Sequence, residues 1–425
     1  MTSWKTLNKS SNENGSRSLS NLFAADVLKV LYAPHKVFKQ IVQNPKYWGP
    51  LLVLLIFTGV QTGLYYAQYS KTYYEQTQPT IGQLSTWTDN TALWMTVPTA
   101  TVSSNVLDIM NTTFYGNTSL QFDLLNSSSL SLAISDLNGS VNCGPGSFQE
   151  LYLQIKVVQP TTAPSSAFIR LFSGGSNYFQ TELTSELSNE TSSFWSNLTI
   201  PVGSGNWQSI GAPSWSSITG MNITLSFPET SSITVRIGSL FFRGFYQTPI
   251  EIYGAGGFTA SVVFSGLFTF IIQWLALSAV FFLVIKLMKG PVTWKPVFIS
   301  IAFALVTMIV QTLIILVTTA TLPAQIRYPF EFAYGFQVTY NPQIVALFSA
   351  ESQFIYNTVI APELATLTSV TAIVVILTYV WITLIGSTIV RAITEFTWTK
   401  SLLASAASVI LTYIILSLLS AFGIV

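Results

Sequence analysis

Hydrophobic residues gather in five long stretches that are free of Asp, Glu, Lys, Arg and His. A helix needs ~20 consecutive apolar residues to cross the hydrocarbon core of a bilayer, and each stretch exceeds that length. The spacing is uneven, because about 190 residues separate the first stretch from the second. The pattern predicts a polytopic α-helical membrane protein with five transmembrane helices, at residues 48–70, 258–285, 297–320, 365–390 and 401–425.

The long interval between the first two predicted helices has a different pattern. Apolar and polar residues alternate there over short runs flanked by turn residues, which is typical of strands with one buried face. Many short strands in about 170 residues favour a β-sandwich. We therefore predict an all-β sandwich or jelly-roll domain over 76–248, inserted between transmembrane helices 1 and 2. The clearest alternating runs are 120–124, 151–157, 221–227 and 233–237.

The last third of this predicted domain resembles the jelly-roll, galactose-binding-like modules of cell-surface proteins. The resemblance rests on the runs 206–210, 215–223 and 232–242. The tryptophans of the domain could stack on sugars, but buried core positions are the more common use of this residue. We favour the core and leave the sugar platform open. The residues concerned are Trp87, Trp94, Trp195, Trp207 and Trp215.

A polar tail and an amphipathic segment precede the first apolar stretch. We expect residues 1–20 to be disordered and 21–47 to form short interfacial helices, broken at Pro34. Apolar residues recur there at helical spacing, with lysines on the other face. This pattern predicts a hairpin lying on an anionic inner leaflet. The candidate leaflet contacts are Lys36, Lys39 and Lys46.

The interval 321–364 is predicted to be an outer loop. Its aromatics, which include Tyr328 and Phe330, suit a belt at headgroup level, and Pro342 could begin an amphipathic helix that ends before Pro362. The loop would then serve as a platform for the β domain or, as we slightly prefer, be an ordinary interfacial loop.

Charge sets the expected orientation. Charged residues make up 8% of the chain and hydrophobic residues 50%, so most of it lies in lipid or in a charge-poor domain. With the N-terminus in the cytoplasm, the inside segments hold 12 Lys and Arg against 3 acids, and the outside segments hold 6 against 14. Basic residues favour the cytoplasmic side. We therefore expect a multi-pass cell-membrane protein with a cytoplasmic N-terminus and an extracytoplasmic β domain and C-terminus.

Glycosylation sequons give a second test of this orientation, because Asn-x-Ser/Thr is modified only outside the cytoplasm. Seven of them fall in the predicted outer domain, more than its composition gives by chance, although the motif also occurs by chance in the N-terminal tail. The candidate acceptors are Asn111, Asn117, Asn126, Asn138, Asn189, Asn197 and Asn222.

Catalytic chemistry has little support. His35 is the sole His and Cys143 the sole Cys, and the expected topology puts them on opposite sides of the membrane, which excludes a Cys/His dyad, a Cys/His zinc site and an intrachain disulfide. Cys143 is expected to be a packed, unreactive thiol. No phosphate-binding loop or nucleophile elbow is present. We expect no enzyme activity, no catalytic or metal residues, no cofactor and no nucleic-acid partner.

Polar groups within the predicted spans are few. Gln61, Gln273 and Gln311 are accompanied by Ser and Thr but by no ionisable residue. Such side chains more often bond helix to helix than line a solute path. Gly59 and Gly63 form a G-x-x-x-G step that suits either packing within the chain or self-association.

The membrane segments resemble the Yip1 family. Pro34, Phe38, Ile41 and Pro45 give the spacing P-x-x-x-F-x-x-I-x-x-x-P before a proline-led apolar stretch, and the basic loop 286–295 and the connection 380–400 are also similar to that family. The resemblance implies five helices and a non-enzymatic scaffold role. The long β domain departs from the short first loop of the family.

We therefore expect a membrane scaffold or a subunit of a cell-envelope assembly. Its partners would be the lipid bilayer and other membrane or envelope proteins or further copies of the chain, with glycans as further candidates for the β domain. A transporter or channel accessory subunit is the alternative.

Overall fold

The computed structural model describes residues 27–109, 118–188, 194–203, 205–322, 325–330 and 361–422. The chain divides into two compact units. The helical unit comprises Met1–Lys71, Pro249–Ala324 and Glu363–Val425, and the β unit comprises Thr72–Thr248 and Gln325–Pro362.

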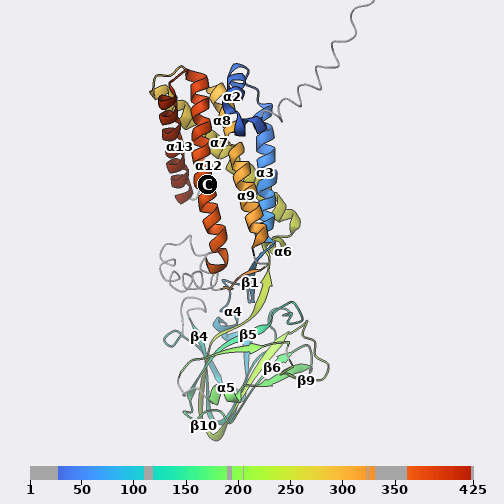
Figure 1. The fold of residues 1–425 in the computed structure, drawn as a ribbon. Coiled ribbons are helices and arrows are strands. Elements are labelled where there is room, and N and C mark those ends of the chain that lie inside the picture. The colour runs from blue at the N-terminus through green and yellow to red at the C-terminus, as the bar shows by residue number, and fades with distance from the viewer. Residues whose placement is uncertain are drawn as a thin grey trace, which may run out of the picture. The chain divides into compact units, whose positions relative to one another are not determined.

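The helical unit has five spans, within the described residues, that are long and apolar enough to cross a membrane. They form because helices satisfy their own backbone hydrogen bonds where no water is available. The third span consists of two helices that meet at Leu305. Figure 1 shows the long helices side by side. The elements are α3 (Trp48–Tyr69), α6 (Pro249–Tyr253), α7 (Ala255–Leu287), α8 (Trp294–Ala304), α9 (Val306–Thr321), α12 (Ala361–Thr394) and α13 (Trp398–Ala421).

Small residues and polar side chains hold these helices together. Helix α3 packs against α7 and α9, and α7 packs against α13. Ser405 on α13 donates a hydrogen bond to the carbonyl of Thr383 on α12, at 2.7 Å. A Cβ atom at Gly386 would lie 2.7 Å from the ring of Phe281, so only glycine fits there. Contacts of this kind are the usual basis of helix association in membranes.

Gly59 and Gly63 do not mark such an approach. A Cβ atom at Gly59 would meet nothing within 4 Å, and one at Gly63 would only touch Leu316 at 4.0 Å. At Gly49, by contrast, a Cβ atom would overlap the ring of Phe303. The chain therefore packs closely at other glycines, and self-association through Gly59 and Gly63 stays a prediction.

The amphipathic segment before α3 packs on the bundle. Residues 27–32 are helical, and α2 (Pro34–Gln43) follows and contacts α8. Its apolar face joins the core of the helical unit, with Phe38 fully buried. This differs from the predicted hairpin lying on lipid, because neighbouring helices cover the apolar face. Lys36, Lys39 and Lys46 are exposed, and their contact with a leaflet stays a prediction.

The β unit contains all the strands of the described chain. The predicted alternating runs lie within its strands, so the β-rich character of this region is confirmed. The elements are β1 (Thr72–Gln78), α4 (Thr86–Asp89), η1 (Thr91–Leu93), β2 (Trp94–Val97), β3 (Thr101–Asn105), β4 (Ser119–Ile134), β5 (Glu150–Gln159), β6 (Ser166–Phe172), β7 (Tyr178–Glu182), α5 (Thr184–Ser188), β8 (Ser196–Pro201), β9 (Gln208–Ile210), β10 (Gly220–Gln247) and β11 (Ile326–Tyr328).

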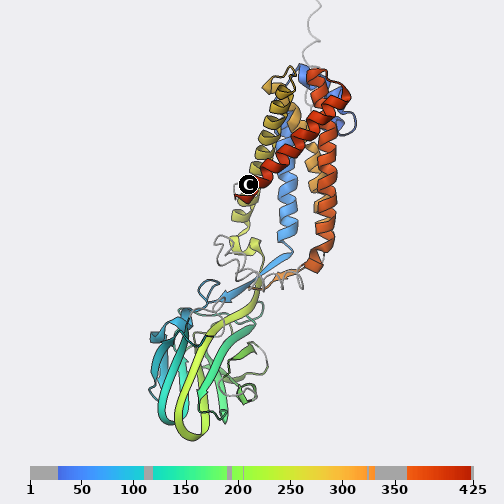
Figure 2. The same cartoon turned by 90° about the vertical axis from the view of Figure 1, so that its left-hand side faces the viewer.

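Two long strands connect two layers. Strands β4 and β10 pair with each other along most of their length, and their register shifts between Ser226 and Ser231, where β10 bends. Figure 2 shows β10 turning back at this bend. Beyond the bend, β10 changes its other neighbour from β6 to β5. One layer therefore has the order β2-β4-β10-β6-β7-β9, and the other has the order β3-β4-β10-β5-β8. In the second layer β1 pairs with the last part of β10, and β11 pairs with β1.

The two layers enclose one apolar core. Alternate residues of β4 and β10, such as Phe122 and Val235, are fully buried in it. Trp87, Trp94 and Trp207 are also buried in this core, as the core interpretation predicts. Trp195 and Trp215 are half-buried, and the ring of Trp215 packs against the core, stacked on Phe179.

Residues 325–330 of the predicted outer loop belong to the β unit, whereas Thr321 is the last residue of α9. Strand β11 pairs with β1, and the ring of Tyr328 stacks on Tyr74 with 5.1 Å between centroids. Phe330 is fully buried against Phe241. Phe330 is thus a packing residue and not part of a headgroup belt. Residues 323–324 and 331–360, including Pro342, lie outside the described residues, and the last residues of the predicted loop already belong to α12, which begins at Ala361.

Candidate functional site

The outer faces of the two β layers differ. Short segments of chain lie over the face formed by β3, β4, β10, β5 and β8, which we call the covered face. The face formed by β2, β4, β10, β6, β7 and β9 has no such cover among the described residues, and we call it the open face. The difference matters because a ligand of the β unit needs accessible side chains.

Asp108 holds one segment on the covered face. Its carboxylate accepts hydrogen bonds from Lys156 Nζ at 2.8 Å, from Trp195 Nε1 at 3.1 Å and from the guanidinium of Arg236. Burial disfavours the ionised carboxylate, but the hydrogen bonds from Lys156, Arg236 and Trp195 outweigh that effect and lower the pKa of Asp108 below its ordinary value. The polar groups of Asp108, Lys156, Arg236 and Trp195 are thus paired with one another, and this cluster holds the segment 106–109, which follows β3, against the sheet. We call it the Asp108 clamp.

Glu75 holds a second segment on the same face. It is 1% exposed and accepts hydrogen bonds from Arg243, from the backbone N–H of Gly244 and from that of Phe330. The guanidinium of Arg243 lies 4.7 Å from the ring centroid of Phe330. Phe330 also packs with Tyr152 and other apolar residues in a small cluster of its own. The covered face is therefore largely committed to packing.

The open face carries a row of outward side chains across six strands. The alternation of side chains along a strand places this row on the outside. On β6, for example, Ile169 and Leu171 are fully buried, and Arg170 between them points outward. The pairing places Arg170 beside Asn222 on one side and Gln180 on the other. The complete row is Met95, Ala133, Asn222, Arg170, Gln180 and Gln208.

Neighbouring contacts hold three side chains of this row in place, those of Arg170, Gln180 and Asn222. Arg170 Nε donates to Gln180 Oε1 at 2.7 Å, and its guanidinium lies 5.1 Å from the ring centroid of Tyr178. Asn222 Nδ2 donates to Ser131 Oγ at 2.6 Å. The terminal nitrogens of Arg170 have no protein hydrogen-bond partner among the described residues. The face thus combines fixed donors and acceptors with the half-exposed rings of Phe172 and Tyr178, which meet edge to face at 5.6 Å.

This arrangement suits binding more than catalysis. A guanidinium and amide side chains recognise hydroxyl or carbonyl groups, and aromatic rings cover the apolar surface between them. The described residues hold no group of three or more His, Cys, Asp or Glu side chains placed to bind a metal ion. Cys143 is buried, and burial raises the pKa of its thiol to about 12.

The sequon asparagines differ in accessibility. Asn126, Asn138 and Asn197 are exposed, the first two at backbone positions of positive φ. Asn222 is 8% exposed, and its amide nitrogen is engaged by Ser131. The fold therefore does not present Asn222 as an acceptor, because β4 and β6 flank it in the middle of a sheet. Asn111, Asn117 and Asn189 lie outside the described residues.

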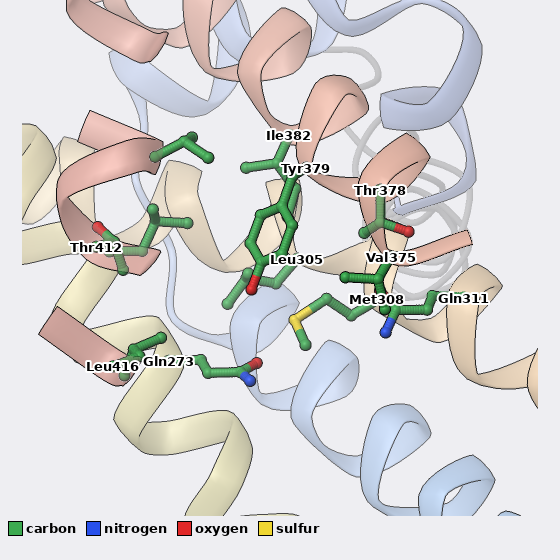
Figure 3. Close-up of a pocket in the computed structure, with 12 residues that line it drawn as sticks. Gln273, Leu305, Met308, Gln311, Val375, Thr378, Tyr379, Ile382, Thr412 and Leu416 are labelled. Atoms are coloured by element: carbon green, nitrogen blue, oxygen red, sulfur yellow. The ribbon is translucent and has the colours of Figure 1, made fainter. Parts of the chain in front are cut away.

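The helical unit contains a cavity of about 120 Å³ among α7, α9, α12 and α13. Figure 3 shows Tyr379, Gln273, Gln311 and Met308 gathered around it. The side-chain carbonyl of Gln273 is buried and has no hydrogen-bond partner in the part of the chain that the structure describes. Gln61 does not line the cavity and instead accepts a hydrogen bond from Thr312 Oγ1 at 3.4 Å.

The sequence pointed to some of these residues and not to others. Gln273 and Gln311 are two of the three glutamines expected to bond helix to helix, and only Gln61 has such a bond among the contacts above. Arg170, Asp108 and Glu75 were not singled out. Only the alternation around Arg170 could have indicated its outward position, and that signal does not name its neighbours.

Comparison with known proteins adds little. No family model matches the chain, and no curated protein matches it. A family 11 carbohydrate-binding module from Clostridium thermocellum, solved with a mixed-linked tetrasaccharide, is 11% identical over 36% of this chain and 90% of its own, with a TM-score of 0.26. A carbohydrate-binding module from the β-sandwich superfamily is 11% identical over 36% of this chain and 57% of its own, with a TM-score of 0.24. An exo-β-agarase gives 11% identity over 37% of this chain and 23% of its own, with a TM-score of 0.28. We take no functional argument from likenesses at this level.

Proposed function

We propose that the protein is a non-catalytic membrane scaffold or assembly subunit whose β unit makes glycan or protein contacts outside the cytoplasm. The observation that carries this proposal is the contrast between the two outer faces. Chain segments held by Asp108 and Glu75 occupy one face, whereas on the other Arg170, Gln180 and the neighbouring Tyr178 stay partly accessible.

Fixed side chains favour binding because their conformational entropy is already lost before a ligand arrives. Ordering a mobile side chain at an interface costs ~0.5–1.5 kcal/mol. Arg170 is held by Gln180 and by the ring of Tyr178, so much of this cost is avoided. A polyhydroxylated ligand such as a glycan could bond to the guanidinium and amides while its C–H surface contacts Tyr178 and Phe172.

The membrane part of the proposal rests on the sequence. Five spans with basic residues concentrated at one set of ends support a cell-membrane protein with a cytoplasmic N-terminus. The scaffold role of the helical unit is inferred from the sequence resemblance to the Yip1 family alone, since no family model matches the chain. Glycosylation at exposed sequons belongs to the same proposal.

A transporter or channel accessory subunit is the second candidate. One observation favours it, namely the cavity among four helices with Gln273 and Gln311 in its wall. A solute path would need polar residues that continue through the bundle, and none of the five spans contains an ionisable residue in its apolar stretch.

The proposal can be tested with the full-length protein in mild detergent on an array of envelope and cell-surface glycans. We expect saturable binding that Arg170→Ala, or Gln180→Ala, weakens about tenfold, because the guanidinium and its positioning amide each contribute hydrogen bonds. Glu229→Gln is the matched control, since Glu229 is exposed at the bend of β10 and away from the row. Co-purification followed by mass spectrometry covers a protein ligand. A protein that binds no glycan and emerges alone and monomeric would refute the proposal.

A further inference from the structure

The cavity of the helical unit is lined by polar as well as apolar side chains, and helix packing alone does not explain the polar ones. Four helices contribute to its wall, and Figure 3 shows the hydroxyl of Tyr379 pointing toward the side of the cavity that carries Gln273. We propose that it is a binding site for a small neutral molecule that combines an apolar body with one hydrogen-bond donor. This inference does not depend on the function of the β unit.

The polar groups of the wall indicate a donor on the ligand. The hydroxyl of Thr378 donates to the carbonyl of Val374 at 2.8 Å, and that of Thr412 donates to the carbonyl of Ser408 at 2.8 Å, so both donors are used within their own helices. The buried carbonyl oxygen of Gln273 has no partner. A buried acceptor in an apolar surrounding is costly to leave unpaired. Among the residues that line the cavity, this carbonyl is the fully buried polar atom that lacks a partner, and its complement is an O–H or N–H.

The absence of charge in the wall indicates a neutral ligand. The side chains that line the cavity include no Asp, Glu, Lys, Arg or His. An ion in the interior of a membrane protein is stable only beside an opposite charge or a dense set of oxygen ligands. The wall supplies neither, so the cavity suits a molecule with no net charge.

Size and polarity further restrict the ligand. A cavity of about 150 Å³ in another protein accommodates benzene, and the cavity here is about 120 Å³. Seven of its twelve lining residues are apolar. Water requires two to four polar partners at each position, and an apolar wall supplies few of them. The two volumes are of the same order, so a single-ring molecule with one hydroxyl is about the largest ligand that suits the mixed wall.

Fluorine NMR of the full-length protein in lipid nanodiscs can test this, with 4-fluorophenol as the probe. The shape-matched probe 4-fluorotoluene lacks the donor and reports partition into lipid and apolar binding. We expect 4-fluorophenol to bind saturably and about fivefold more tightly than 4-fluorotoluene, as one net hydrogen bond would give.

Three variants locate the effect. Gln273→Leu removes the acceptor with little change in size and should bring the two affinities within about twofold of each other. Gln61→Leu, the matched control in α3, should leave the preference for the phenol intact. Val409→Phe should fill the cavity and abolish binding of both probes.

Two results would overturn the proposal. One is a wild-type protein that binds neither probe better than Val409→Phe does, which would show that the cavity holds only water or is inaccessible. The other is a preference for the phenol that Gln61→Leu removes as fully as Gln273→Leu, which would show that the carbonyl of Gln273 is not the acceptor.

Discussion

Glu75 and Arg243 form a two-point ion pair inside the β unit. Arg243 Nε lies 3.0 Å from Glu75 Oε1, and a terminal guanidinium nitrogen lies 3.1 Å from Glu75 Oε2. The same carboxylate accepts the N–H of Phe330 at 3.0 Å, so one buried side chain joins β1, β10 and the segment that carries β11. The segment that carries β11 is far from β1 and β10 in the sequence, and its contact with the Glu75 carboxylate holds it on the covered face.

Removing this carboxylate should loosen the segment around β11. Breaking a buried ion pair by deleting one partner costs ~3–5 kcal/mol. We expect Glu75→Ala to lower the opening free energy of β1 and β11 by about 3 kcal/mol, measured by hydrogen exchange with mass spectrometry. Glu75→Gln should cost less, because an amide oxygen can still accept the N–H of Phe330. Exchange in Glu75→Ala no faster than in the control Glu182→Ala would show that other contacts hold the segment.

The ion pairs of Asp108 should make the stability of the fold depend on pH. The pKa of this carboxyl is lowered in the folded protein, so its ionised form stabilises the fold above the ordinary carboxyl range. That contribution is lost as the pH falls through the folded pKa. We expect Asp108→Asn to lower the melting temperature at pH 7 and the difference from wild type to shrink as the pH falls below ~4. Glu229→Gln should follow the wild-type curve, and a pH-independent difference for Asp108→Asn would contradict the clamp.

Cys143 should resist thiol reagents while the protein is folded. Burial removes access to the sulfur and raises its pKa to about 12, so almost no thiolate forms at pH 8. We expect no labelling by iodoacetamide in mild detergent and complete labelling after denaturation, as read by intact-mass spectrometry. Rapid labelling of the folded protein would place Cys143 at the surface, against the structure.

The parts of the fold that depend on local pattern could be predicted from the sequence. The five spans follow from apolar stretches of bilayer length. The break at Leu305 could not be predicted, because the third apolar stretch runs through it without a change of pattern. The runs 221–227 and 233–237 were predicted as separate strands, and both belong to the bent strand β10. The bend coincides with the register shift between Ser226 and Ser231, and no local pattern encodes the pairing of both halves of β10 with β4, which lies about 100 residues earlier.

The candidate sites depend on such distant pairings, which is why the sequence did not show them. Arg236 and Lys156 meet Asp108 only because β10 and β5 pair in one register. Gln273 and Gln61 look alike in the sequence, since each is a lone glutamine in an apolar stretch. They differ because Thr312 donates to Gln61, whereas the carbonyl of Gln273 accepts no hydrogen bond from the described residues.

The sequons join the fold to the expected topology. If the β unit faces away from the cytoplasm, expression in cultured eukaryotic cells should give glycans on Asn126, Asn138 and Asn197, whose side chains are exposed. Changing each of these residues to Gln should increase gel mobility by one step, and enzymatic deglycosylation should remove the differences.

Asn222→Gln provides the internal control, because its amide nitrogen is buried and bonded to Ser131. We expect it to leave gel mobility unchanged and to lower the melting temperature, since the longer side chain cannot keep that bond in the same register. A mobility step at Asn222 would require β10 to open at this point before or during modification. An absence of glycan at every sequon, together with cleavage of the β unit by protease only from the cytoplasmic side, would reverse the orientation and with it the side on which the open face meets its ligand.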